Sequence, residues 1–221
     1  MTTSTSPTLP RRLAAEMLGT ALLVMAVVGS GAMAQVLTRD VAVQLLANAG
    51  ATVGALYALI TMFGPISGAH FNPVVTAASC ALDGRPWRDL PTYAIAQLIG
   101  GSVGAVAANV MFDLPALGPS EWARTGGGQW FAEAVATAGL LAVIVLVGST
   151  KPTAVASAVA AWIGGAYWFT SSTSIANPAV TVARSLTTSF AGIAPASVPA
   201  FIAMQVVGAA VAIPALKWLR G

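Results

Sequence analysis

The chain has 221 residues, of which 57% are hydrophobic and only 8% are charged, whereas about 25% of the residues of a soluble domain carry a charge. Apolar segments long enough to cross a bilayer, roughly 20 residues, recur along it, which excludes an ordinary soluble protein and indicates a polytopic membrane protein. The net charge of +3 does not indicate a nucleic-acid partner, because the basic residues lie at the ends of apolar segments rather than in a patch. Since Cys80 is the only cysteine and His70 the only histidine, we expect no metal site and no cofactor.

The first part of the chain predicts a short tail and three spans. Residues 1–10 are expected to form a disordered tail, because the first nine are rich in Ser, Thr and Pro. Spans are predicted at about 13–37, 41–63 and 90–112. The first could also be interpreted as a cleaved signal peptide, but Glu16 lies inside it and a similar Glu recurs in the second half, so we interpret it as a permanent span.

The second part predicts three more spans after a linker. Residues 113–129 are polar and rich in Gly and Pro, which is typical of a connection between two halves. The later spans are predicted at about 130–149, 153–171 and 197–219. The halves themselves are residues 11–112 and 130–221.

One Asn-Pro motif follows the second span of each half. The motifs are Asn72-Pro73-Val74 and Asn177-Pro178-Ala179. Asn is a preferred helix N-cap and Pro is favoured at the first helical position, so we expect half-helices over 73–82 and 178–188. The first would be about 15 Å long at 1.5 Å per residue, half a bilayer. Two such N-termini meeting near the midplane would place their positive dipole ends together, which favours neutral solutes over cations.

The halves also correspond in their polar residues. Glu16 in the first half answers Glu133 in the second, and Gln97 answers Gln205. Because each half has an odd number of spans, the second copy must be inserted upside down, as an inverted repeat. The predicted fold is therefore an all-α membrane protein with six transmembrane helices and two re-entrant half-helices.

Orientation follows from the basic residues at the span ends. If the chain crosses the membrane six times, seven basic residues lie on one side: Arg11, Arg12, Arg85, Arg88, Lys151, Lys217 and Arg220. Two lie on the other side, Arg39 and Arg124. The positive-inside rule then places both termini in the cytoplasm.

The doubled motif, the order of the spans and the approach Ser67-Gly68-Ala69-His70-Phe71-Asn72-Pro73 resemble the aquaporin family, the major intrinsic proteins, over residues 11–220. The resemblance implies a homotetrameric channel of the cell membrane that passes small neutral solutes through the bilayer. It also implies that Asn72 and Asn177 donate to the permeating solute; capping alone is the alternative. Val74 departs from the family's usual Ala.

Other polar residues acquire roles from the same resemblance. His70 is expected to order its loop and to line the cytoplasmic vestibule. Glu16 and Glu133 are expected to anchor the re-entrant loops, with a proton relay as the alternative. Gln97 and Gln205 are expected to bond across helices.

The selectivity filter departs from the pattern of the water-selective members, which is similar to a ring of an aromatic residue, a His, a small residue and an Arg. Counting from the motif asparagines assigns these four positions to Thr52, Gly165, Ser174 and Val180. Such a filter would be wide and weakly polar, and its missing Arg resembles a bacterial subgroup associated with arsenic resistance. Arg184, one turn beyond Val180, would either fold back over it or extend to the outer water, and we favour the second.

The sequence therefore predicts a passive channel, not an enzyme, for water, glycerol-like polyols and arsenite. A water-selective channel or an ordinary glycerol facilitator is the alternative within the family. An ion-coupled secondary transporter with broken helices is the alternative from another class.

Overall fold

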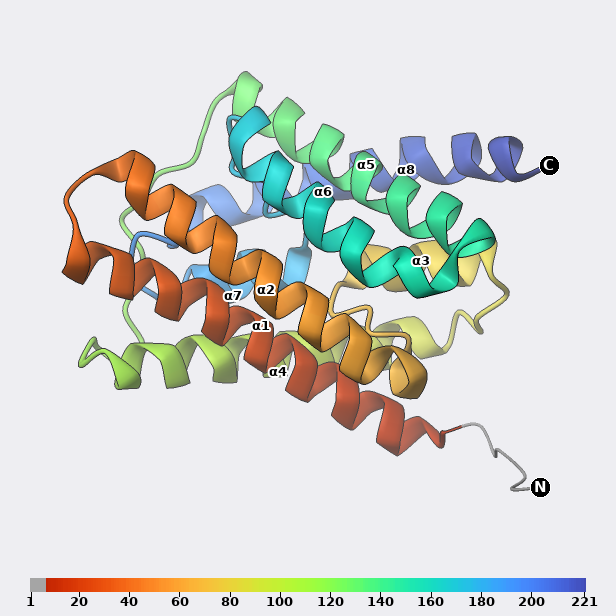
Figure 1. Ribbon diagram of the computed structural model, residues 1–221, viewed down its shortest axis with the longest axis horizontal. Helices are drawn as coiled ribbons and strands as arrows, with labels where there is room; N and C mark the ends of the chain where they lie inside the picture. Colours follow the sequence, from red (N-terminus) through yellow and green to blue (C-terminus); the bar gives the residue numbers. More distant parts are fainter. Residues whose placement is uncertain (1–6) are drawn as a thin grey trace.

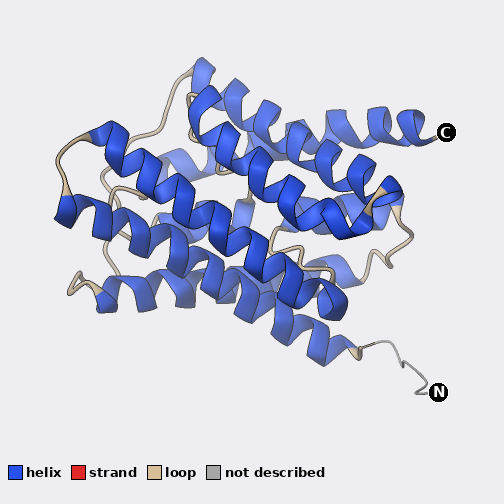
Figure 2. Ribbon diagram, in the orientation of Figure 1, coloured by secondary structure: helices blue, strands red, loops and turns tan. Residues whose placement is uncertain are grey.

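The computed structural model describes residues 7–221, and most of the predicted tail, residues 1–6, lies outside the described part. The described chain contains helices and loops and no strand (Figure 2). Its helices are α1 (Leu9–Leu37), α2 (Val41–Ser67), α3 (Pro73–Leu82), α4 (Asp89–Met111), α5 (Gly127–Thr150), α6 (Val155–Phe169), α7 (Pro178–Arg184) and α8 (Val198–Arg220). Since α1 begins at Leu9, the predicted tail of residues 1–10 is too long.

Six of these helices take the places of the predicted spans. Within residues 7–221, five are long and apolar enough to cross a membrane by length and composition: α1, α2, α4, α5 and α8. The sixth, α6, has 15 residues and follows a 3-10 turn at Pro152–Ala154. The second half begins slightly earlier than expected, because α5 starts at Gly127 inside the predicted linker 113–129.

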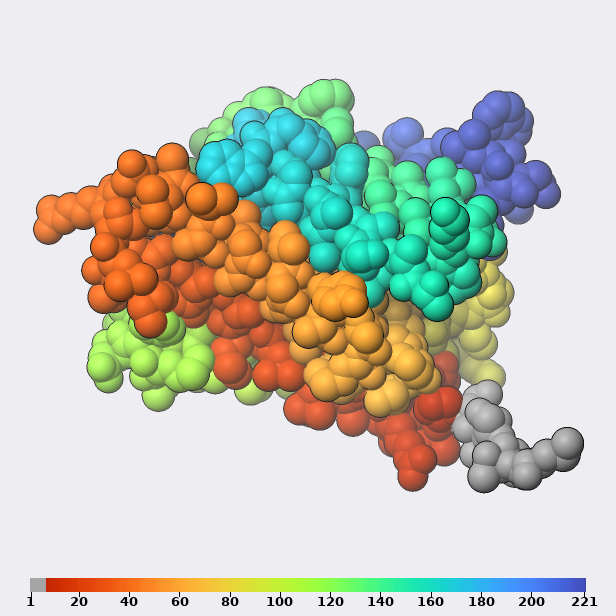
Figure 3. All heavy atoms as spheres, viewed as in Figure 1, coloured from red at the N-terminus to blue at the C-terminus, as the bar shows by residue number. Residues whose placement is uncertain are grey.

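The two halves pack in the same way. In the first, α1 packs against α2 and α4; in the second, α5 packs against α6 and α8. The halves meet where α2 lies along α6, and each half-helix contacts the last helix of the opposite half, α3 against α8 and α7 against α4 (Figure 1). The space-filling view shows α2 and α6 side by side over the viewed face (Figure 3).

The start of α1 and the end of α8 lie at the same end of the bundle (Figure 1). At this end Arg12 of α1 pairs with Asp89 at 3.2 Å, and Arg220 of α8 pairs with Asp83 at 2.8 Å. Here we call it the terminal end. The opposite end carries the α1–α2 turn, the α4–α5 linker and the loop that follows α7.

Glycines let the helices of each half approach closely. A methyl group added at Gly100 would lie 2.1 Å from the carbonyl oxygen of Met17, and one at Gly208 would lie 2.4 Å from that of Ala134. Met17 and Ala134 each follow the buried Glu of their half. Only glycine permits this backbone separation, which brings α4 and α8 within reach of Glu16 and Glu133.

The second half-helix is shorter than predicted, because α7 ends at Arg184 and not at residue 188. Tertiary hydrogen bonds take the carbonyl groups at its end. Ile193 N–H donates to Arg184 O at 3.2 Å, Ser120 N–H donates to Ser185 O at 3.1 Å, and Leu186 O accepts from Gly118 N–H at 3.2 Å. These donors replace the N–H groups of a further helical turn, so the helix can end here while its last carbonyl groups remain hydrogen-bonded.

Candidate functional site

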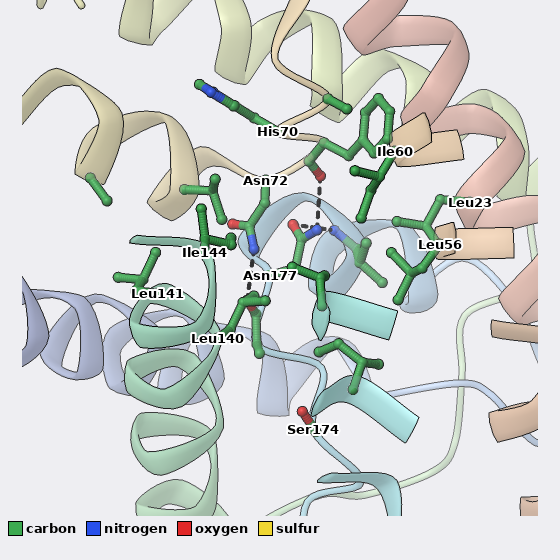
Figure 4. A pocket seen from close by; sticks show the side chains of 18 of the residues that line it. Leu23, Leu56, Ile60, His70, Asn72, Leu140, Leu141, Ile144, Ser174 and Asn177 are labelled. Atoms are coloured by element: carbon green, nitrogen blue, oxygen red, sulfur yellow. Dashed lines mark hydrogen bonds between the residues drawn. The ribbon is translucent and has the colours of Figure 1, made fainter. Parts of the chain in front are cut away.

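The two Asn-Pro motifs meet inside the bundle. Asn72 caps α3 by accepting from Val74 N–H at 3.0 Å, and Asn177 caps α7 by accepting from Ala179 N–H at 3.0 Å. Their side-chain amides cross between the halves: Asn72 donates to Ala176 O at 2.8 Å, and Asn177 to Phe71 O at 2.8 Å (Figure 4). Each NH₂ group carries two hydrogens, so each retains one after this bond.

The loops before the two asparagines share an unusual backbone. Residues three and one before each Asn have left-handed φ: Ala69 at 50° and Phe71 at 50°, Ser174 at 53° and Ala176 at 48°. Such a conformation costs a non-glycine residue about 1–3 kcal/mol. It persists only where the surroundings hold it, and two buried carboxylates do so here.

Glu16 and Glu133 bind these loops in equivalent ways. Glu16 accepts from His70 N–H at 2.9 Å and Phe71 N–H at 2.7 Å, and Glu133 accepts from Ile175 N–H and Ala176 N–H, both at 2.9 Å. Both carboxylates are fully buried. Because hydrogen bonds to an ionised group are about twice as strong as neutral ones, each carboxylate offsets the strain of its loop.

The two glutamines complete the network across the helices. Gln97 donates to Glu16 at 2.7 Å, and Gln205 to Glu133 at 2.6 Å. Each also donates to a Thr on the adjacent half-helix, Gln97 to Thr76 and Gln205 to Thr181. The carboxylates are thus surrounded by donors, an arrangement suited to anchoring the loops.

A cavity of ≈ 160 Å³ runs past both asparagines. Asp83 and His70 line it toward the terminal end, and Ser174, Val180 and Arg184 line it toward the opposite end. Figure 4 shows His70 and Ser174 on opposite sides of the asparagine pair. His70 is held by a contact of 3.0 Å between its Nδ1 and the hydroxyl of Thr76. Apolar side chains from α1, α2, α5 and α6 form much of the wall, among them Leu23, Leu56, Leu140 and Ile163.

Three of the four predicted filter residues line this cavity, namely Thr52, Ser174 and Val180. The fourth assignment, Gly165, is wrong: Gly165 is exposed on the outer face of α6, and the cavity does not reach it. The inward face of α6 is formed by residues four apart, Val159, Ile163 and Tyr167. Tyr167 takes the place opposite Thr52, with their hydroxyl oxygens 3.1 Å apart.

The preferred expectation for Arg184 is also wrong. Its side chain does not extend to the outer water but is 2% exposed and lines the cavity. Its Nε donates to the carbonyl oxygen of Ala191 in the loop after α7. That loop folds back over the end of α7, so burial of the guanidinium follows from a tertiary contact that the sequence does not display.

Arg124 is a second cation close to this loop, half-buried, which the sequence analysis placed only among the basic residues at the span ends. It lies in the α4–α5 linker and donates to Gly192 O at 3.0 Å, next to the carbonyl group that Arg184 uses. Burial, and after it the charge of Arg184, lower the pKa of Arg124 to about 9. A lone Arg in a Gly-rich linker gives no signal by which this could have been predicted.

Comparison with known proteins places this architecture in a family. The family model described as "Major intrinsic protein" matches residues 3–168. Aquaglyceroporin AqpS of Rhizobium meliloti (strain 1021) is 50% identical over 212 residues, which cover 96% of this chain and 91% of that protein. Aquaporin NIP1-2 of Arabidopsis thaliana is 38% identical over 104 residues, which cover 47% of this chain and 35% of that protein.

A solved structure shares the fold. The X-ray structure of the aquaglyceroporin from Plasmodium falciparum superposes with a TM-score of 0.64 at 20% identity, covering 96% of this chain and 95% of that one. The chain thus has six helices around two half-helices that meet at paired asparagines, and it matches this family in sequence as well. The chain belongs to the major intrinsic protein family, and it is a passive membrane channel for small neutral solutes and not an enzyme.

Proposed function

We propose that the channel conducts neutral hydroxylated solutes larger than water, with glycerol and arsenite as representatives, in addition to water. The observation that carries the proposal is the wall at Val180. This side chain lines the cavity in the first turn of α7, which Asn177 caps, and it has neither a donor nor a charge. The section of the pore at this level therefore has no guanidinium to confine permeating molecules to a single file of water.

The paired asparagines supply the polar step at the centre of the pore. Each asparagine uses one amide hydrogen in the bond to the opposite loop and keeps the other one free, and both side chains line the cavity. We infer that these hydrogens donate to the oxygen atoms of a passing solute. The facing N-termini of α3 and α7 add a positive potential there, which disfavours cations.

We further propose that both termini are cytoplasmic and that the channel is a homotetramer of the cell membrane. The orientation is supported by the basic residues, since the terminal end carries seven of them (Arg11, Arg12, Arg85, Arg88, Lys151, Lys217 and Arg220). The cavity mouth at Arg184 is then the outer mouth. Large apolar side chains exposed on the outer helix faces, such as Leu46 at 60% and Val211 at 67%, suit lipid and neighbouring subunits.

The test is osmotic swelling of vesicles that contain the purified protein, against water, glycerol, urea and arsenite. We expect glycerol and arsenite to enter much faster than into empty vesicles. Entry of water alone would support the water-selective alternative. Uptake against a gradient, driven by pH or sodium, would support an ion-coupled transporter; the complete hydrogen bonding of Glu16 and Glu133 argues against that class.

A further inference from the structure

The outer third of the cavity contains a guanidinium that the motif positions do not predict. Val180 occupies the position at which a filter Arg would stand, yet Arg184, one turn later on α7, is buried and lines the same cavity. Residues four apart lie on one helix face, and a helical side chain leans toward the N-terminus of its helix. Arg184 therefore stands on the same face of α7 as Val180, one turn further from Asn177.

Only part of the Arg184 guanidinium is used by the protein. Its Nε donates to Ala191 O, and no residue within 7–221 accepts a hydrogen bond from either terminal nitrogen. An Arg side chain has five N–H donors in a planar fork, so four remain. Donors that line a cavity and have no protein partner are available to whatever occupies the cavity.

No carboxylate of the described residues forms a direct ion pair with Arg184. The ion pairs formed within residues 7–221 do not include Arg184 or Arg124. Glu133, the buried carboxylate of the same half, is already bonded to Ile175, Ala176 and Gln205. Arg124 adds a second positive charge, bonded to the carbonyl group next to that of Ala191.

Further polar groups line the same stretch. The hydroxyl of Ser174 is buried, lines the cavity and has no partner within the described residues. The hydroxyls of Thr52 and Tyr167 lie 3.1 Å apart on the neighbouring wall. Donors and acceptors thus line a section whose other wall, at Val180, is apolar.

Resting on the proposed function above, we propose that Arg184 is the specificity-determining cation of this channel, displaced outward by one helical turn from the position that Val180 occupies. Its free terminal N–H groups donate to the oxygen atoms of hydroxylated solutes as they enter, and its charge repels cations. The displacement separates two tasks: recognition occurs at Arg184, whereas the section at Val180 stays open to solutes larger than water.

The test compares Arg184→Lys and Arg184→Gln with wild type in proteoliposomes. Arg39→Gln is the matched control, because Arg39 lies at the same end of the molecule but is exposed. Two quantities are measured on each preparation: the ratio of glycerol to water permeability, and the proton permeability. Monodispersity in detergent and thermal unfolding are recorded for each variant.

Arg184→Gln removes the charge, so we expect proton permeability to rise about tenfold, a change on the scale of losing one hydrogen bond from a charged group. Arg184→Lys keeps the charge but not the planar fork, so we expect proton exclusion to be retained and the glycerol-to-water ratio to change by several-fold. Arg39→Gln should match wild type in both measurements.

A folded Arg184→Gln with wild-type values of both quantities would overturn the proposal. If that variant is not recovered folded, an unchanged permeability ratio in Arg184→Lys would overturn it alone. Failure of the proposed function has a different signature, because wild-type vesicles would then take up glycerol no faster than empty ones. Wild-type vesicles that conduct, with variants that do not differ from them, would contradict the role of Arg184 alone.

Discussion

Asn72 and Asn177 each donate a side-chain hydrogen bond of 2.8 Å to the backbone of the other's loop, to Ala176 O and Phe71 O respectively. Each amide therefore has three functions at one point. Its oxygen caps its own half-helix, one N–H ties the two halves together, and the other N–H is left for the lumen. No other neutral side chain of this length offers an acceptor and two donors.

Replacement of either asparagine by aspartate is therefore expected to damage both assembly and selectivity. In Asn72→Asp the carboxylate still caps α3 but faces Ala176 O without a hydrogen, a loss of about 1–3 kcal/mol for the unpaired group. The new negative charge also attracts cations to the centre of the pore. Proton-flux measurements on reconstituted vesicles should show a leak in both variants, and wild-type values in both would remove the asparagines from the mechanism.

Glu133→Gln tests the anchoring of the second loop. A glutamine has one acceptor oxygen and no charge, whereas the carboxylate accepts from Ile175, Ala176 and Gln205. We expect unfolding to become easier by about 1.5–3 kcal/mol, the value of a hydrogen bond to a charged group, together with loss of solute flux. Thermal unfolding in detergent is the measurement, and the exposed Glu121→Gln is the control. A variant of normal stability whose flux had merely lost its pH dependence would favour a proton relay instead.

Mercurial sensitivity tests where Ser174 lies. Cys80 carries the only thiol of the chain. It is buried and is not one of the residues that line the cavity, whereas Ser174 is one of them. We expect mercurials to leave wild-type glycerol flux unblocked at the filter, and Ser174→Cys to become strongly inhibited whether or not Cys80 is also changed to Ser. Inhibition of wild type that disappears in Ser174→Ala but persists in Cys80→Ser would be inconsistent with this placement.

Val180→Arg should narrow the pore. The new side chain would enter the cavity one turn inside Arg184, so we expect a strong fall in glycerol and arsenite flux with part of the water flux retained. Swelling assays with each solute measure this, and Val180→Leu separates the effect of volume from that of charge. Unchanged glycerol and arsenite permeation in Val180→Arg would show that position 180 does not form the constriction.

Gly100→Ala tests the close approach of α1 and α4. Its methyl group would lie 2.1 Å from the carbonyl oxygen of Met17, the residue that follows Glu16. Overpacking of this kind costs about 1–3 kcal/mol, which thermal unfolding should detect. Gly50→Ala is the control, because a methyl group there meets nothing within 4 Å. Equal stability of the two variants would contradict the helix separation described above.

Much of this protein was predictable from the sequence because the determining interactions are local. Asn is preferred at the N-cap and Pro at the first helical position, and α3 covers the predicted residues 73–82. Apolar length predicts spans, and the recurrence of Glu and Gln at matching places predicts the repeat. Glu16 and Glu133 could be interpreted as anchors, because a buried carboxylate requires donors and the loops offer free N–H groups.

Only the tertiary structure decided the outer part of the pore. The end of α7 depends on hydrogen bonds that its last carbonyl groups accept from the backbone N–H groups of Gly118, Ser120 and Ile193. Gly118 and Ser120 are far away in the sequence, and Ile193 lies in the irregular loop that follows α7. Gly165 was assigned by counting through a loop, but the inward face of α6 is set by its packing, which selects Tyr167. The direction of Arg184 depends on where the loop carrying Ala191 folds. The sequence places an Arg on α7, but whether its side chain faces the lumen is determined by tertiary contacts with the loop that folds back over the helix.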